Sequence, residues 1–195
     1  KHGKDWKKLA SGDIPVYGSG GIMGYVDTYS YDKPTVLIPR KGTITNLFYV
    51  DSAFWNVDTI YYTEIDETKI LPKYLYYVIK TIDLMSLDTG SGRPSLTQAI
   101  LNKLLIPMPC PDNPEKSLAI QAEIVRILDA FTAMTAELTA ELNMRENQYN
   151  YYREHLLSFD EGDVEWKTLG DIAEIGTGKH DTRDAIEDGE YIFYA

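Results

Sequence analysis

The sequence is poor in the side chains that usually build metal and redox sites. It has one cysteine, Cys110, and three scattered histidines, His2, His155 and His180. A single cysteine excludes a disulfide framework and a cysteine zinc cluster, and the histidines have no carboxylate or thiol at ligand spacing. Cys110 lies among prolines with no base beside it, which favours a packed or free thiol. We therefore expect no catalytic residue, no metal and no cofactor.

The sequence also lacks long hydrophobic runs. No apolar stretch approaches the roughly 18 residues of a membrane span, and nothing at Lys1 resembles a signal peptide. The chain has 195 residues, of which 44% are hydrophobic and 12% aromatic. That composition excludes a disordered chain and allows one or two domains with a substantial core. We expect a cytoplasmic protein with no membrane contact.

Positive charge is scarce and unevenly distributed. The formal net charge is −11, yet residues 1–50 hold seven Lys and Arg against four Asp and Glu, a balance of +3. Residues 161–195 hold three against ten, a balance of −7. A contact with DNA, if the protein makes one, is therefore expected in the first segment.

Residues 117–157 contain neither proline nor glycine. Apolar residues recur there at alternating steps of three and four, a heptad pattern that predicts a helix roughly 60 Å long. The expected cap is Asn113 with Pro114, or Ser117. The predicted helix-pairing residues, called the heptad stripe below, are Ile124, Leu128, Phe131, Leu138, Leu142, Tyr149 and Tyr152, followed by Leu156, with Gln121, Thr135 and Arg145 at the remaining positions. The stripe predicts pairing with a second helix; packing along its own domain is the alternative.

The segments before this helix indicate strands and short helices. β-Branched and aromatic runs predict strands at 14–17, 35–38, 47–50 and 59–63, with a glycine turn at 18–21. Apolar spacing predicts a helix over 72–87 and a short helix within 96–104. The proline-rich run at 106–111 is expected to be extended. The predicted fold class is α+β: a mixed β-rich domain followed by a long coiled-coil-forming helix.

Two short motifs resemble functional sequences only superficially. The glycines at 18–24 lack the Lys-Ser/Thr of a phosphate-binding P-loop, so a turn is favoured. Residues 88–91 have the letters of an aspartic protease, but they follow a helical pattern, and that chemistry needs two facing carboxylates. Neither motif predicts an active site.

A small basic cluster near the start of the chain, with Trp6 inside it, and polar or cationic residues on the glycine loops are candidates for DNA contact. Phosphates are contacted by cations and backbone N–H groups, whereas bases are read by Arg, Lys, Asn, Gln, Ser or Thr on elements that reach a groove. Each such residue alone is more often a solvated surface charge. The candidate DNA-binding residues are Lys4, Lys7, Lys8, Ser19, Arg40, Lys41 and Arg93.

Several segments together carry a family resemblance. Residues 106–109, 124–129, 135–142 and 148–153, with Gln121, resemble the central conserved region of type I restriction-modification specificity (S) subunits. Residues 164–170 resemble the opening of the next target recognition domain of such a subunit. Residues 14–21 and 35–42 resemble the body of one. The resemblance covers nearly the whole chain.

The resemblance implies a function and a set of partners. An S subunit has two target recognition domains that each read one half of a split DNA sequence, separated by two long helices paired antiparallel. Methyltransferase (modification) subunits carry S-adenosylmethionine and methylate adenine, and a restriction subunit cleaves. The implied partners are therefore double-stranded DNA and these two kinds of subunit, and the S subunit itself is non-catalytic.

The same resemblance suggests a domain organisation. Residues 1–112 correspond to a target recognition domain without its N-terminal part, 113–160 to the spacer helix, and 161–195 to the opening of a second domain. Residues 12–17 and 189–194 are loosely alike, which suggests one period of a two-unit repeat. Residues 161–195 are expected to complete a recognition domain, in their own chain or in a partner.

A single long helix leaves its stripe without a partner, so we expect a homodimer with antiparallel helices. A coiled-coil interaction or assembly protein that does not read DNA is the alternative function. A DNA affinity that falls steeply with salt would distinguish the two. The sequence does not give the target bases, because no residue-to-base code exists for this fold.

Overall fold

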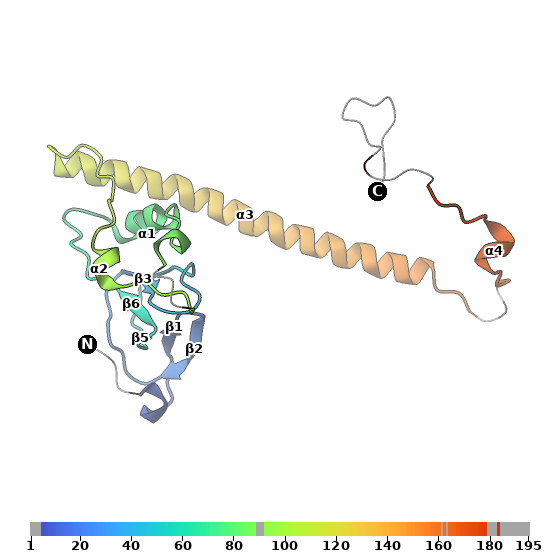
Figure 1. The fold of residues 1–195 in the computed structure, drawn as a ribbon, viewed down its shortest axis with the longest axis horizontal. Helices are drawn as coiled ribbons and strands as arrows, with labels where there is room; N and C mark the ends of the chain where they lie inside the picture. The colour runs from blue at the N-terminus through green and yellow to red at the C-terminus, as the bar shows by residue number, and fades with distance from the viewer. Residues whose placement is uncertain (1–4, 89–91, 161, 163, 179–182, 184–195) are drawn as a thin grey trace. The chain divides into compact units, whose positions relative to one another are not determined.

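The structure is a computed structural model, and it describes residues 5–88, 92–160, 162, 164–178 and 183. It is of the α+β class, as predicted, and clusters into two compact units, Lys1–Leu138 and Thr139–Ala195. The strands are β1 (Ile14–Gly18), β2 (Gly21–Val26), β3 (Thr35–Pro39), β4 (Phe48–Val50), β5 (Trp55–Asn56) and β6 (Ile60–Tyr62) (Figure 1). The helices are η1 (Trp6–Lys8), α1 (Pro72–Lys80), η2 (Met85–Leu87), α2 (Gln98–Leu101), α3 (Pro114–Leu156) and α4 (Leu169–Ile172).

The strands of the first unit form two small sheets. In one sheet β1 lies between β2, which is antiparallel to it, and β5, which is parallel. In the other sheet β3 lies between β4 and β6, and both pairs are antiparallel. The four strands predicted from the sequence correspond to β1, β3, β4 and β6, and β2 and β5 are additional.

The core of the first unit is organised around β3, whose five residues are all buried. Successive side chains of a strand point to opposite faces of the sheet. Val36 and Ile38 accordingly belong to one apolar cluster, with Ile79 of α1, and Leu37 belongs to another, with Phe54. Burial on both faces explains why this strand is an unbroken apolar run rather than an alternating one.

The two short helices are shorter than predicted. The spacing over 72–87 predicted one helix, but α1 ends at Lys80 and a separate 3₁₀ turn, η2, follows. The Asp83 carboxylate accepts hydrogen bonds from the backbone N–H groups of Met85 and Ser86, so a local side-chain bond replaces the helical pattern. The predicted helix within 96–104 is the single turn of α2, capped by the Thr97 hydroxyl.

Helix α3 begins at Pro114, and Asn113 is its cap, because the Asn113 side chain accepts a 2.9 Å bond from the Lys116 N–H. The start of α3 lies over α1 (Figure 1). Ser117 and Gln121 are buried there. The Gln121 amide accepts a bond from the Leu71 N–H and donates bonds to the Lys69 carbonyl and the Ser117 hydroxyl. The beginning of α3 therefore packs on its own domain.

The heptad stripe lies largely on the surface. Ile124 and Leu128 are half-buried. The later residues have exposed fractions between 51% and 67%: Phe131, Leu138, Leu142, Tyr149, Tyr152 and Leu156. The structure thus shows packing on the domain for the beginning of this helix, and pairing with a second helix stays a prediction for the rest of it. Its first turns pack on the domain, whereas the apolar residues farther along have no cover within the described chain.

The described part of the second unit after α3 contains one short helix, α4. The Thr168 side chain and the Asp171 carboxylate cap its first turn reciprocally. The large apolar residues of this segment are exposed by 58% to 80%: Trp166, Leu169, Ile172 and Ile175. Residues 189–194, half of the predicted repeat, lie outside the described residues. No helix in the described ranges is both long and apolar enough to cross a membrane.

Candidate nucleic-acid interface

Three loops that are distant in the sequence meet around Gly42. A Cβ atom at Gly42 would stand 2.9 Å from Nη2 and 3.5 Å from Nε of Arg93, and 3.4 Å from Oγ of Ser19. Ser19 lies in the turn between β1 and β2, and Gly42 follows β3. The structure thus brings together Ser19, Arg93 and the 40–42 loop, all of which the sequence proposed as DNA contacts. We call this group, with Arg40 and Lys41, the loop cluster.

Backbone hydrogen bonds hold the loop cluster in place. The Gly42 N–H donates to the Pro94 carbonyl and the Leu96 N–H donates to the Arg40 carbonyl, each at 2.9 Å. Lys41 and Ser95 form an isolated antiparallel bridge. These bonds fix the 92–95 segment against the 40–42 loop. The side chains on both segments therefore extend from a constrained backbone.

Two further residues fix the β1–β2 turn, and sequence reasoning missed both. The Ser19 N–H donates to the Thr59 hydroxyl at 3.3 Å, and the Asn46 amide donates to the Ser19 carbonyl at 3.3 Å. These contacts join positions 40 and 27 residues apart. No local pattern in the sequence signals them, because they depend on how the two sheets are placed.

The three cations of the loop cluster differ in what they already bind. Nη1 of Arg40 donates to the Asp58 carbonyl at 3.3 Å, so part of this guanidinium is engaged. Lys41 and Arg93 are exposed. Within the described residues, neither of their charged groups has a carboxylate within ion-pair distance. Their charges are available to an anion such as a DNA phosphate.

The remaining predicted contacts lie elsewhere. Lys7 and Lys8 are exposed on η1, which begins at a cap made by the Asp5 carboxylate. The ring of Trp6 fills the space beside Gly24 of β2, where a Cβ would come within 2.8 Å of it. The structure therefore places these two lysines beside the middle of β2 rather than in the loop cluster. Lys4 lies outside the described residues.

A polar network joins α1 to α3 away from the loops. Lys73 and Tyr77 of α1 both bind the Asp129 carboxylate, at 2.8 Å and 2.6 Å. Partial burial alone would raise the pKa of Asp129, but these hydrogen bonds outweigh it and the pKa lies below its ordinary value. The same bond raises the pKa of Lys73. The network stabilises the junction and has no free cation to offer a ligand.

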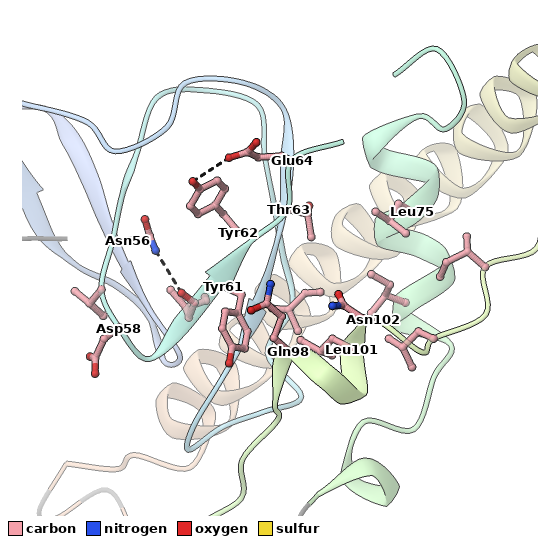
Figure 2. A pocket seen from close by; sticks show the side chains of 16 residues that line it. Asn56, Asp58, Tyr61, Tyr62, Thr63, Glu64, Leu75, Gln98, Leu101 and Asn102 are labelled. Atoms are coloured by element: carbon pink, nitrogen blue, oxygen red, sulfur yellow. Dashed lines mark hydrogen bonds between the residues drawn. The ribbon is translucent and has the colours of Figure 1, made fainter. Parts of the chain in front are cut away.

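A cavity of about 640 Å³ lies between β6, α1 and α2. Figure 2 shows Tyr61, Gln98 and Asn102 gathered on one side of it, with Leu75 on α1. Its charged lining residues are Asp58 and Glu64, and no Lys or Arg lines it. An acidic lining repels phosphate, so the cavity is a poor candidate for the DNA contact.

The part of the chain that the structure describes contains no cluster of metal-ligating side chains. Among the residues that the structure describes, no three His, Cys, Asp or Glu side chains lie together as metal ligands. Cys110 is a free, half-buried cysteine. The structure does bring together a set of constrained loops that carry polar and cationic side chains, and such a surface suits contact with an anion.

Comparisons with known proteins identify the family of the chain. The family model described as "Type I restriction modification DNA specificity domain" matches residues 3–145. The chain is 47% identical over 182 residues to the type I restriction enzyme EcoR124I/EcoR124II specificity subunit of Escherichia coli, an alignment that covers 89% of this chain and 44% of the relative. It is 67% identical over 98 residues to the EcoprrI specificity subunit of the same species, covering 47% of this chain and 24% of the relative. The chain thus spans less than half the length of either relative.

A solved structure supports the fold. The crystal structure of the S subunit of a type I restriction-modification system from M. genitalium matches with a TM-score of 0.52 at 22% identity, covering 75% of this chain and 41% of that one. The matched relatives are specificity subunits of type I restriction systems, as the sequence predicted. The chain belongs to the type I restriction-modification DNA specificity family.

Proposed function

We propose that the chain binds double-stranded DNA and reads one half of a split target for a type I restriction-modification complex. The observation that carries this proposal is the convergence of Ser19, Lys41 and Arg93 around Gly42 from three separate loops. A surface of this kind combines cations for phosphate with polar groups for base edges. Lys7 and Lys8 on η1 extend the contact along the phosphate backbone.

The long helix supplies the second half of the proposal. Two copies pair antiparallel through the heptad stripe, and each copy contributes one recognition domain, so the dimer reads two half-sites. The exposed apolar side chains of Phe131, Leu138 and Leu142 support this pairing. In the assembly the paired helices separate the two domains and recruit the modification subunits and the restriction subunit. Residues 161–195 open a second recognition domain.

The test is the salt dependence of DNA binding. Fluorescence anisotropy with a labelled duplex of mixed sequence, over about 50 to 300 mM salt, would give the slope of log K against log salt. Each phosphate neutralised contributes roughly 0.9 to that slope. We expect a steep slope, reduced by about one in Lys41→Ala. Lys33→Ala is the matched control, because Lys33 is exposed and precedes β3, whereas Lys41 follows the other end of that strand.

The possible results separate the two candidate functions. A steep slope that only Lys41→Ala reduces supports DNA binding by the loop cluster. Equal effects of both variants would place the contact elsewhere on the domain. The absence of duplex binding by a folded protein would contradict the proposal and favour a coiled-coil assembly protein.

A further inference from the structure

The guanidinium of Arg93 lies close to the position that the Cβ atom of any non-glycine residue would occupy at position 42. Gly42 has a φ of +90°, a backbone conformation that glycine adopts without strain. A Cβ there would approach Nη2 of Arg93 to 2.9 Å, closer than real Cβ contacts occur. Gly42 therefore suits the turn of its own loop and leaves room for the path of the Arg93 side chain, whose flexible end would have to shift if a Cβ were present.

The backbone that follows Arg93 is held by hydrogen bonds to two other segments. The next two residues are bonded to the 40–42 loop, through the Pro94 carbonyl and the Lys41–Ser95 bridge. The Ser95 N–H also donates to the Asp88 carboxylate at 2.8 Å. An arginine on such a segment loses less conformational freedom when it binds than one on a loose loop. A restrained backbone of this kind suits a contact with one base at a defined position more than a general attraction to phosphate charge.

The three cations of the loop cluster therefore suit different tasks. Arg40 donates to the Asp58 carbonyl and braces the loop. Lys41 is an exposed point charge on a flexible stem, which suits a phosphate. The Arg93 guanidinium has neither a hydrogen bond nor an ion pair within the described residues. It presents a planar set of donors, and the base edge that matches two parallel N–H donors is the O6 and N7 pair of guanine in the major groove.

We propose that Arg93 is a specificity-determining residue that recognises a guanine of the target half-site, and that Gly42 is its positioning residue. This inference rests on the proposed function and adds to it a base identity and a division of roles. Arg93 gives discrimination between sequences, whereas Lys41 gives affinity for all of them. Truncation of the two side chains must then have different effects.

The experiment finds the preferred sequences by selection, so no target sequence has to be assumed. The full chain would be used to select bound duplexes from a library with a randomised region, and the selected pools would be sequenced. The same selection would be run with Arg93→Ala, Arg93→Lys, Gly42→Ala and Lys41→Ala. Thermal unfolding of each variant, followed by circular dichroism, would show that it is folded. Affinities for the selected duplex and for single-base changes of it would then be measured.

The expected result is a guanine in the wild-type consensus that Arg93→Ala no longer prefers. A bidentate arginine contact corresponds to roughly 5- to 150-fold discrimination, so the wild type would bind the changed duplex more weakly by that factor. Arg93→Ala would bind both duplexes alike. Arg93→Lys would retain part of the preference. Gly42→Ala would weaken it at the same base pair, because the arginine is displaced but still present. Lys41→Ala would leave the consensus unchanged.

Two results would overturn the inference while leaving the proposed function intact. One is an unchanged consensus for Arg93→Ala with a smaller salt slope, which would make Arg93 a phosphate contact. The other is a loss of preference at a position that is not guanine. A folded wild-type chain that binds duplex DNA but selects no consensus would remove the reading role of Arg93 together with the reading part of the proposed function. Failure to bind any duplex would instead remove the proposed function itself, and the inference with it.

Discussion

The ammonium of Lys73 lies 2.8 Å from Oδ2 of Asp129, and this ion pair joins α1 to α3 across 56 positions of sequence. Oδ1 of the same carboxylate accepts a bond from the Tyr77 hydroxyl. The two charged side chains are 37% and 36% exposed, so water screens their attraction. The start of the long helix is therefore joined to its domain by a moderate electrostatic contact as well as by the buried amide of Gln121.

Replacement of Asp129 by Asn would measure this contact. Asn keeps the shape of the side chain but lacks the negative charge. That charge attracts Lys73 and makes the hydrogen bond from Tyr77 short. We expect the free energy of unfolding to fall by about 1 kcal/mol, a modest value because the pair is partly exposed. Urea denaturation measures it. Glu137→Gln, at an exposed site farther along α3, is the control and should change stability by less than about 0.5 kcal/mol. Equal losses in both variants would show that the contact contributes nothing.

The same carboxylate predicts a dependence of stability on pH. The folded-state pKa of Asp129 is lower than its ordinary value of 3.8, so folding favours the ionised form. Its contribution is complete above the ordinary pKa and disappears as the pH falls through the lower, folded-state value. The stability difference between wild type and Asp129→Asn should therefore be constant from about pH 7 to 5 and shrink below about pH 4. Asp66, whose pKa is about 2, is present in both proteins and cancels.

Urea midpoints of the two proteins, measured at several pH values, would test this prediction. A difference that persists undiminished at the lowest pH would mean that the carboxylate charge is not the source of the stabilisation. A difference that grows on acidification would mean that the folded-state pKa is raised rather than lowered.

Replacement of Gln121 should lower the free energy of unfolding more than replacement of Asp129. The Gln121 side chain is fully buried and forms hydrogen bonds with three partners. In Gln121→Ala the Leu71 N–H and the Lys69 carbonyl lose their partner, and a cavity remains. The expected loss of unfolding free energy is roughly 2 to 4 kcal/mol. Gln148→Ala, at an exposed position of the same helix, should cost at most about 0.5 kcal/mol. Chemical denaturation would give the free energy of unfolding of both variants. Similar losses in the two would contradict the stabilising role of the buried Gln121 side chain.

Gln121 also shows what spacing in a sequence can and cannot predict. The heptad period assigned it to the helix-pairing stripe, but its partners are Lys69 and Leu71, which lie about fifty positions earlier. Periodicity reports which residues share a helix face, not which neighbour covers that face. The length of α3 was predicted, and Asn113 was one of the two predicted caps, because both features depend on local sequence. The strands β1, β3, β4 and β6 were predicted for the same reason, since β-branched and aromatic runs favour extended backbone, whereas β2 and β5 were missed.

The loop cluster was predicted only in part, for a related reason. Residue type and glycine-rich surroundings singled out Ser19, Arg40, Lys41 and Arg93. Their convergence on Gly42 depends on the Lys41–Ser95 bridge and on bonds to Thr59 and Asn46, which are non-local. The separate position of Lys7 and Lys8 follows from the packing of Trp6 on Gly24, which no spacing rule contains. The sequence could nominate individual contacts but not assemble them into one surface.

The exposed apolar residues of α3 predict an assembly that a single substitution should disrupt. Leu142, 58% exposed, lies in the heptad stripe, whereas Met144, 65% exposed, lies on another face of the same helix. In an antiparallel pair a charge at the Leu142 position is forced into the apolar interface, but a charge at the Met144 position stays in water. We expect Leu142→Asp to convert a dimer into a monomer in sedimentation equilibrium, and Met144→Asp to remain dimeric.

The wild-type melting temperature should rise with protein concentration, as linkage requires of a dimer, and that of Leu142→Asp should not. A wild-type chain that is strictly monomeric at micromolar concentration would contradict the pairing, and dissociation of both variants alike would mean that the stripe is not the interface.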